Sequence, residues 1–308
     1  MAKTRIVLLC VFAALAGAAL IVAQGQSSPE TVRVVIPGVW FREGDLKNLG
    51  HSNNVIIEMK DYLIVVDANF PSGARAALAD AKRISSKPVK YVFLTHHHGD
   101  HLYGSAVWTL AGATTLAYKA VAEEIQRVEP GRWQETAKTR KDVAEMNRTG
   151  PEPPLKTFGE DLFVLNDGRR KVEFRFFGWA HTRGDGFVYL PKEQLLCTGD
   201  AVVNGPYNYT GDANVANWPT VVRAAAKLKV KHVLPGHGIP AGKEIMAGQE
   251  QFFEELYKAV KAGADQGKTP EQIKASLVLP DGVQNWVGDG LASQVNDTYQ
   301  QIKAPPRP

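Results

Sequence analysis

Cysteine is nearly absent from this sequence. Only Cys10 and Cys197 occur among 308 residues, so removal of the amino end would leave one cysteine and no internal disulfide. Cys197 ends the apolar segment Leu195-Leu196-Cys197, which is typical of a buried small hydrophobic residue rather than of a nucleophile. The fold is therefore expected to depend on its hydrophobic core and not on covalent cross-links.

A strong charge bias is absent as well. The 36 Lys and Arg residues and 32 Asp and Glu residues leave a formal net charge of +4, which gives no indication of a nucleic-acid or acidic partner. No internal repeat is visible. With 44% hydrophobic and 22% charged residues, the composition is that of an ordinary globular protein, and the length is within reach of one large α/β domain.

The amino end has the composition of a targeting segment. Lys3 and Arg5 precede an uncharged apolar run over residues 6–23, which a polar segment over residues 24–29 ends. This layout predicts a signal peptide over residues 1–25, although an uncleaved anchor is the alternative because the run is about long enough to span a bilayer. Its Ala/Gly-rich composition favours cleavage near Gln26. An export signal without disulfides indicates a bacterial periplasmic or secreted protein, with no stable membrane association after cleavage.

Residues 30–308 predict a single α/β domain followed by carboxyl-terminal helices. A hairpin over residues 55–67, a helix over 72–84 and a strand over 89–94 indicate a βαβ unit. Residues 118–147 are expected to be mostly helical, with a break at Pro130-Gly131. Further expected elements are strands over 114–117, 162–165, 171–179, 187–190, 195–197 and 232–234, and helices over 105–110 and 219–229. Two or three helices follow.

Four histidines and a carboxylate lie close together directly after the strand over 89–94. The segment is Thr95-His96-His97-His98-Gly99-Asp100-His101. Open α/β sheets place their ligand chemistry at the carboxyl ends of strands. Imidazole and carboxylate groups at this density usually bind a divalent metal. The sequence therefore predicts a metal site at this edge.

Three later segments supply residues of the same kind. His181 lies in the segment 178–185, Asp200 in 197–200 and His237 in 235–238. With the preceding H-x-H-x-D-H pattern, these segments resemble the motifs of the metallo-β-lactamase superfamily, in family order, from about Val32 to about Ile239. The resemblance implies an α/β fold, the four-layer αββα sandwich of that superfamily.

The resemblance also implies the ligands of two metal ions. One ion would bind His96, His98 and His181, the other would bind Asp100, His101 and His237, and Asp200 would bridge them. Two Zn²⁺ are the implied cofactors, although iron and manganese accept the same ligands. A hydroxide between the metals would attack a carbonyl carbon, and Asp100 would orient it and relay its proton.

Other polar residues have a supporting interpretation. Asp67 stands where family members carry a carboxylate beneath the metals, which would orient the histidines; a strand-end turn is the alternative. Alternation makes His97 point away from the metals. His51 could reach the site, but a loop histidine is the commoner outcome, and His232 is interpreted as packed or exposed. Asp185 is interpreted as a turn residue before the next strand.

Two departures from the family patterns bear on function. Family members that reduce oxygen usually place Glu where this chain has His98, and true β-lactamases generally place Ser or Cys where it has Asp200. A bridging Asp is typical of the glyoxalase II-like and lactonase-like branches. The sequence therefore predicts an exported metallo-hydrolase acting on an ester, thioester, lactone or amide of a small-molecule substrate. A β-lactam hydrolase, a mononuclear-iron dioxygenase and a non-catalytic binding protein of this fold are the alternatives.

Two loops are candidates for the substrate pocket. Residues 37–44 include Trp40, and residues 202–213 include Tyr207, Asn208 and Tyr209. In family members a loop at the first position often leans over the metals; the alternative is a hairpin whose Trp40 belongs to the core. Neither loop carries an arginine clamp that would indicate a substrate, and the oligomeric state stays open.

Overall fold

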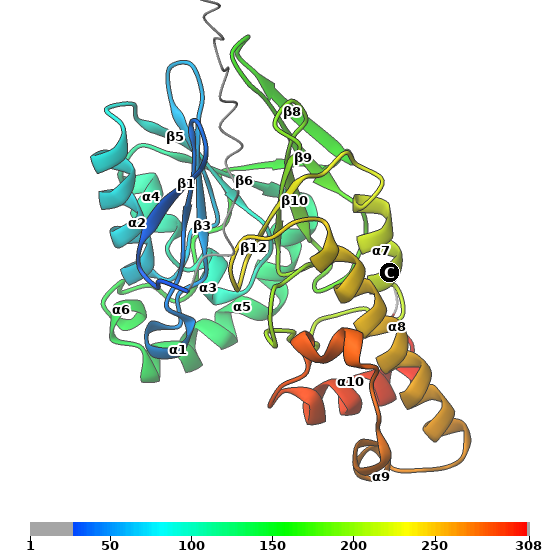
Figure 1. Ribbon diagram of the computed structural model, residues 1–308. Helices are drawn as coiled ribbons and strands as arrows, with labels where there is room; N and C mark the ends of the chain where they lie inside the picture. The colour runs from blue at the N-terminus through cyan, green and yellow to red at the C-terminus, as the bar shows by residue number, and fades with distance from the viewer. Residues whose placement is uncertain (1–26, 307–308) are drawn as a thin grey trace, which may run out of the picture.

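Two β-sheets pack face to face, and helices cover the outer face of each sheet (Figure 1). The computed structural model describes residues 27–306, so the expected signal peptide over residues 1–25 lies outside the described residues. This arrangement confirms the predicted four-layer αββα sandwich. Within the described residues, no helix is both long enough and apolar enough to cross a membrane.

The first sheet has seven strands in the order β1 to β7. Their bounds are β1 Val32–Ile36, β2 Val39–Arg42, β3 Asn54–Glu58, β4 Leu63–Val66, β5 Val89–Leu94, β6 Thr114–Tyr118 and β7 Lys156–Phe158. Strands β3 and β4 form the expected antiparallel hairpin, while β4, β5, β6 and β7 run parallel. The βαβ unit is therefore present as predicted.

The second sheet has five strands in the order β12-β11-β10-β9-β8. Their bounds are β8 Leu162–Asn166, β9 Lys171–Phe176, β10 Gly186–Leu190, β11 Leu195–Gly199 and β12 His232–Pro235. Strands β11 and β12 are parallel, and the other neighbours are antiparallel. Each strand expected from residue 162 onward is present.

Helices on both sides bury apolar faces against the sheets. Their bounds are α1 Leu46–Leu49, α2 Pro71–Ile84, α3 Gly99–Leu102, α4 Ser105–Leu110, α5 Lys119–Thr139, α6 Lys141–Ala144, α7 Trp218–Ala225, α8 Glu244–Asp265, α9 Pro270–Ser276, the 3-10 helix Asp281–Trp286 and α10 Leu291–Lys303. Helices α2, α4 and α5 pack on the first sheet, and α7, α8 and α10 lie on the side of the second (Figure 1). Residues such as Phe93 and Phe174, from different sheets, form the core between them.

Pro130 does not break its helix, contrary to the sequence-based expectation. Helix α5 continues from Lys119 to Thr139, although a proline inside a helix costs about 3 kcal/mol or more. Ile125 and Trp133 are buried on either side of Pro130 and pack in the same core cluster. Burial of both halves of the helix offsets the lost backbone hydrogen bond.

The functional loops leave the sheets at one edge. Asp67 follows β4, the histidine segment 95–101 follows β5, Asp200 follows β11 and His237 follows β12. Because these strands are parallel within their pairs, their carboxyl ends meet at a common edge of the sandwich. Both sheets therefore contribute to one site.

Candidate metal centre

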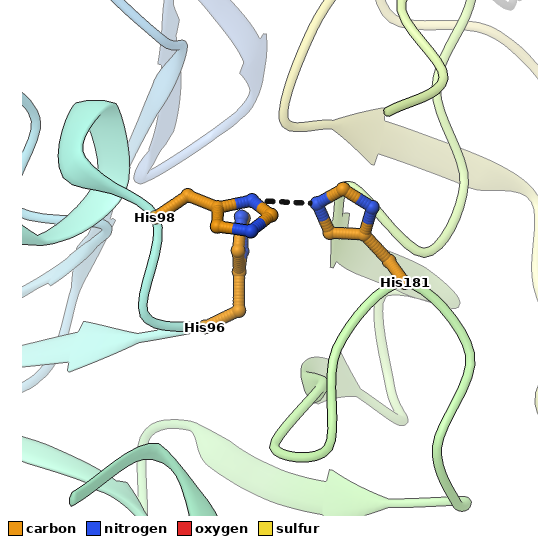
Figure 2. Close-up of side chains that lie close together, drawn as sticks. All are labelled: His96, His98 and His181. Atoms are coloured by element: carbon orange, nitrogen blue, oxygen red, sulfur yellow. Dashed lines mark hydrogen bonds between the residues drawn. The ribbon is translucent and has the colours of Figure 1, made fainter. Parts of the chain in front are cut away.

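The first ligand group consists of His96, His98 and His181 and is called here the three-histidine group. Figure 2 shows the three rings pointing toward one another, His96 and His98 from one loop and His181 from the facing loop. One nitrogen of each ring lies within 4.8 Å of the others, and His98 Nδ1 is 2.9 Å from His181 Nε2. Three imidazole nitrogens directed at one point form a typical site for a divalent cation.

The second ligand group consists of Asp100, His101 and His237 and is called here the mixed group. His237 Nε2 is 3.0 Å from Asp100 Oδ2 and 3.3 Å from His101 Nε2. His237 lies in the loop after β12, and Asp100 and His101 lie in the short helix α3, which is separated from the end of β5 by four residues. A carboxylate and two imidazoles form a second donor set beside the first.

Asp200 lies between the two groups. Its Oδ2 is 3.3 Å from His237 Nε2 in the mixed group and 3.8 Å from His181 Nε2 in the three-histidine group. Its Oδ1 is 3.4 Å from His101 Nε2. The sequence-predicted ligands are thus all brought together, with Asp200 in the shared position.

The donor atoms fit bound cations. Among the described residues, His96 Nε2 and Asp200 Oδ1 are buried and have no hydrogen-bond partner. Buried polar atoms are normally satisfied, and a cation bound between the rings and the carboxylate would satisfy both. Imidazole and carboxylate donors suit zinc, iron and manganese. The residues therefore fit the metals that the sequence implies.

The protonation of the histidines differs between the two groups. Burial lowers the pKa of His96 well below its usual value and that of His181 to about 3, with further lowering from neighbouring histidines. Burial also acts to lower the pKa values of His101 and His237, but Asp100 and Asp200 outweigh it, raising that of His101 well above normal and that of His237 to about 9. The three-histidine group is therefore neutral, whereas His101 and His237 hold protons that would have to leave when a cation binds.

Asp67 lies directly beneath the mixed group. Its Oδ2 is 2.8 Å from His101 Nδ1, and its Oδ1 accepts a hydrogen bond from the Thr95 N–H at 2.8 Å. It is 2% exposed and has a left-handed backbone, with φ 66°. Asp67 thus orients a ligand ring and the start of the histidine loop together, as a supporting carboxylate does.

Asp212, from the loop over residues 202–213, has the corresponding position behind the three-histidine group, a role that no pattern in the sequence predicts. Its Oδ2 is 2.8 Å from His98 Nε2. Arg132 of α5 donates to both carboxylate oxygens, at 2.7 and 2.8 Å. Burial acts to raise the pKa of Asp212, but hydrogen bonds from His97, His98 and Arg132 hold it well below its usual range. No motif marks either residue, because each lies outside the strand-end segments.

His97 takes part in this support rather than in the ligand groups. The side chain is buried, and its Nε2 is 3.3 Å from the Arg132 guanidinium. His97, His98 and Asp212 also form a group that could hold a cation, but the guanidinium already lies there. The two remaining histidines are away from the centre: His51 contacts Glu30 and Ser72, and His232 begins β12.

Asp185 does more than form a turn. It is 3% exposed and accepts hydrogen bonds from the backbone N–H groups of Ala180 and Thr182 and from the Thr182 hydroxyl. These contacts hold the loop that carries His181. Burial raises the pKa of Asp185 to about 7, against the lowering effect of these hydrogen bonds.

The His237 loop is held across the sheet interface. Asn53, in the loop before β3, donates from its side chain to the carbonyls of Pro235 and Gly238, at 2.9 and 2.8 Å. A Cβ at Gly236 would lie 2.1 Å from Asp200 Oδ1, so only glycine allows this backbone to pass the Asp200 carboxylate.

A cavity of about 570 Å³ opens over the centre. His98, Asp100, Asp200 and His237 lie at its base, and Arg132 contributes a cationic group. Its other lining residues are Leu46, Pro206, Tyr207, Asn208, Tyr209, Thr210, Gly290, Ser293 and Gln294. A neighbouring cavity of about 620 Å³ shares Leu46, Pro206, Tyr207 and His237 with it.

The expected substrate loops are only partly at this cavity. Tyr207, Asn208 and Tyr209 line it, and the Tyr209 carbonyl lies 3.0 Å from His181 Nδ1. Trp40 does not line it: residues 39–42 form β2, and Trp40 packs with the core cluster on the outer face of the first sheet. Strand alternation, which directs Val39 and Phe41 toward the inner core, turns Trp40 to the opposite face.

Comparison with known protein families finds a matching family model. The model described as "Metallo-beta-lactamase superfamily" matches residues 48–237. Among curated relatives, the 2,4-dinitroanisole O-demethylase subunit alpha of Nocardioides sp. (strain JS1661) is 28% identical over 192 residues, 61% of this chain and 53% of that protein. A metallo-beta-lactamase type 2 of Bacillus sp. (strain 170) is 26% identical over 202 residues, 63% of this chain and 70% of that protein. The chain thus matches about half of the demethylase subunit.

Solved structures share the fold. The metallo-beta-lactamase FIM-1 of Pseudomonas aeruginosa, in its mono-zinc form, superposes with a TM-score of 0.59 at 24% identity, covering 76% of this chain and 98% of that chain. The inverting sec-alkylsulfatase Pisa1 of Pseudomonas sp. superposes with a TM-score of 0.67 at 18% identity, covering 90% of this chain and 52% of that one. Because the sulfatase superposes on 90% of this chain, the structural likeness extends beyond residues 48–237, which match the family model.

Proposed function

Because this chain belongs to the metallo-β-lactamase superfamily, we propose that it is an exported hydrolase that uses two zinc ions to cleave an ester, thioester, lactone or amide. Members of this superfamily are mostly hydrolases, and the chain carries His/Asp groups able to bind metal. The number of ions, their identity and the reaction are the parts proposed here.

The observation that carries the proposal is the convergence of the two ligand groups on Asp200. A site for one ion needs one donor set, whereas this centre has two, with a carboxylate between them. Two dications held close together repel unless an anion lies between them. The position of Asp200 therefore supports a dinuclear centre.

The chain's own residues would divide the chemistry. Bound zinc supplies a water whose pKa is lowered to about 7 and polarises a carbonyl oxygen. Asp100, at the cavity base and 3.0 Å from His237 Nε2, is placed to hold and relay a proton. Asp212 would hold the ring of His98 in the three-histidine group, and Asp67 would hold the ring of His101 in the mixed group. The cavity would orient the substrate.

The cavity favours a substrate with an apolar body. Leu46, Pro206, Tyr207 and Tyr209 form an apolar part of its wall, and His98, Asp100, Asp200 and His237 lie at its base. This distribution places the reacting group at the centre and an alkyl, acyl or aryl portion against the walls. Because relatives are named as a dinitroanisole O-demethylase and a β-lactamase, and a structural neighbour as an alkylsulfatase, their substrate classes belong in the test.

β-Lactam hydrolysis is a second candidate, supported by the 26% identity to a metallo-beta-lactamase type 2. The bridging Asp200 argues for the other branch, since true β-lactamases generally have Ser or Cys there. A mononuclear-iron dioxygenase of this fold is the third candidate. The second ligand group argues against it, because one iron ion would leave the mixed group without a function.

Export is the remaining part of the proposal. Its support is the basic and then apolar amino end, residues 1–25. Mass spectrometry of the protein recovered from outside the cytoplasm is expected to show a chain that starts near Gln26. An intact segment from Met1 to Ala23 in exported protein would instead indicate a retained anchor.

The deciding experiment combines metal quantification with a substrate panel. Protein loaded with zinc is expected to hold two ions and to hydrolyse at least one of an ester, a lactone, a thioester, a β-lactam, a nitro-substituted aryl methyl ether and an alkyl sulfate. Metal content that never exceeds one ion would remove the dinuclear proposal. One tightly held iron, together with oxygen consumption, would replace it with the dioxygenase.

A further inference from the structure

One face of helix α10 holds the loop that lines the cavity. Gln294, Asp297 and Gln301 are spaced three and four residues apart, so they lie on the same face. Gln294 Nε2 donates to the Asn208 carbonyl at 2.7 Å, and Asp297 accepts from the Thr210 hydroxyl at 2.6 Å. Because α10 lies beyond the residues that match the family model, this contact is an addition to the family core.

Gln301 completes the same contact further along the helix. Its Oε1 accepts from the Val215 N–H at 2.9 Å, and its Nε2 donates to the Ala213 carbonyl at 3.0 Å. The loop between β11 and α7 is therefore held by α10 over several residues. The Tyr209 carbonyl in this loop contacts His181 Nδ1, so α10 supports a loop that reaches the three-histidine group.

Helix α10 also forms part of the cavity wall. Ser293 and Gln294 line the cavity together with Gly290, which precedes the helix, and Asn208 lies in the same wall. Gln294 is 2% exposed and Asn208 is 6% exposed. Behind them lies Gln249 of α8, which is fully buried. Three side-chain amides thus meet at one part of the wall.

These amides are not satisfied by one another. Gln249 Nε2 donates to Asn208 Oδ1 at 2.7 Å, which leaves Asn208 Nδ2 and Gln249 Oε1 without partners among the described residues, and Gln294 Oε1 also has none. If the oxygen and nitrogen of both the Asn208 and the Gln249 amide were exchanged, Asn208 would donate to Gln249. One N–H donor and one carbonyl-type acceptor of the pair would still have no partner. Buried polar groups normally have partners, so these three atoms are available to bind a further hydrogen-bonding group.

We propose that Asn208 and Gln294, with Gln249 behind them, form a subsite that binds an uncharged hydrogen-bonding group of the substrate, such as a hydroxyl or a carboxamide. The free atoms include an N–H donor and two carbonyl-type acceptors. An anion would face the amide oxygens and a cation would face the N–H group, so neither is favoured. A hydroxyl or amide can donate and accept at once. The inference deepens the proposed hydrolase function and rests on it for the identity of the reacting bond.

The first test uses matched substrates and matched variants. A series of 4-nitrophenyl esters with acyl chains of increasing length, each ending either in methyl or in hydroxyl, samples the distance from the centre to the subsite. At the length that fits, the hydroxyl-ended ester is expected to have a kcat/KM about tenfold higher than its methyl-ended counterpart, mainly through KM. In Gln294→Met, this ratio is expected to fall toward one.

Gln300→Met is the matched control, because Gln300 is the same residue type on the exposed side of α10. It is expected to keep the full preference for the hydroxyl-ended ester. A merely structural role of Gln294 would lower activity on both ester series equally and leave the ratio unchanged, and that result would overturn the subsite.

The second test does not depend on turnover. Side-chain amide NMR signals of Asn208 and Gln294 are recorded while the corresponding carboxylic acids, hydroxyl-ended or methyl-ended, are added to metal-loaded protein. The hydroxyl-ended acid of fitting length is expected to shift these signals, and the methyl-ended acid is not. The subsite would be rejected if both acids shifted the amide signals equally. It would also be rejected if neither acid shifted them and a bound water were detected at these amides, since the wall would then hold only a trapped water. Failure of all ester hydrolysis with a selective NMR response would reject the ester reaction and retain the subsite.

Discussion

In each of the two ligand groups, one histidine ring is hydrogen-bonded to a carboxylate that lies behind it. In the mixed group, His101 Nδ1 is 2.8 Å from Asp67. In the three-histidine group, His98 Nε2 is 2.8 Å from Asp212. At the level of the ligand ring the two arrangements match, since each carboxylate fixes which nitrogen is left to bind a metal.

The two carboxylates differ in what holds them. Asp67 directly follows strand β4, and its partners Thr95 and His101 are buried. Asp212 lies in a loop and is held by Arg132, whose side chain is 35% exposed. Ion pairs that water can reach are weaker and more sensitive to salt than buried hydrogen bonds. The mixed group therefore has support built into the sheet, and the three-histidine group has support that solvent and substitution can change.

The largest expected effect comes from the residue shared by both groups. Asp200→Asn removes the charge between two proposed dications and replaces a strong oxygen donor with a weak amide donor. One ion is expected to be lost preferentially, and hydrolysis is expected to fall by orders of magnitude while the fold is kept. Metal stoichiometry, circular dichroism and turnover measure these three outcomes.

The exposed Asp61 is the control for this substitution. Asp185 does not serve, because it is buried and holds the His181 loop. Asp61→Asn is expected to keep both ions and full activity. Full metal content and activity in Asp200→Asn would reject its bridging position and the dinuclear proposal with it.

Asp67→Asn is expected to have the next largest effect. The amide can accept from the Thr95 N–H or face His101, but it lacks the charge that serves both contacts. Affinity for the ion at the mixed group is expected to fall about 10–100-fold, and the protein is expected to lose roughly 1–3 kcal/mol of unfolding free energy because buried groups lose partners. Competition with a chelator and thermal unfolding measure the two effects. Equal weakening of both ions would show that the groups are not supported separately.

Asp212→Asn tests the other support and is expected to have a smaller effect. Affinity is expected to fall at the three-histidine group, up to about tenfold because the ion pair is partly exposed, with little change in stability. Arg132→Gln is expected to reproduce part of this loss, and the double variant is expected to be less than additive because both residues act through His98. High salt should reduce the difference between wild type and Arg132→Gln. A loss at the mixed group would contradict the assignment.

This difference also explains what could be predicted from the sequence. The ligands and Asp67 follow strands with strong apolar patterns, so their place at one sheet edge could be inferred from position along the chain. Asp212, Arg132 and the α10 amides act across loops and helices, and their contacts depend on tertiary packing that no local pattern encodes. Trp40 shows why such contacts could not be predicted. The face of β2 on which its side chain lies depends on the pairing register with β3, and the turn-rich sequence around Trp40 does not specify that register.

The smallest expected effect concerns the outer support of the mixed group. Glu30 contacts His51 Nδ1 at 3.0 Å and pairs with Arg42, and His51 precedes Ser52, whose hydroxyl donates to the Asp100 carbonyl at 2.6 Å. Burial acts to raise the pKa of Glu30, but His51, Arg42 and the Asp45 N–H together lower it from 4.5 to about 2. Since the folded-state pKa lies below the unfolded value, the stabilisation is full above pH 4.5 and is lost as the pH falls toward 2.

Glu30→Gln should therefore cost stability at neutral pH and flatten the acid limb of the stability curve between pH 4.5 and 2. Solvent access to this ion pair limits the loss to about 1 kcal/mol, or roughly 2–4 °C in Tm. The exposed Glu160 is the matched control, and Glu160→Gln is expected to leave the acid limb unchanged. His51 and Ser52 link Glu30 to Asp100 of the mixed group. In Glu30→Gln, chelator competition is therefore expected to show any loss of metal at the mixed group and none at the three-histidine group. An acid limb that keeps its slope in Glu30→Gln would mean that other carboxylates control acid unfolding and that the Asp100 loop does not depend on this contact.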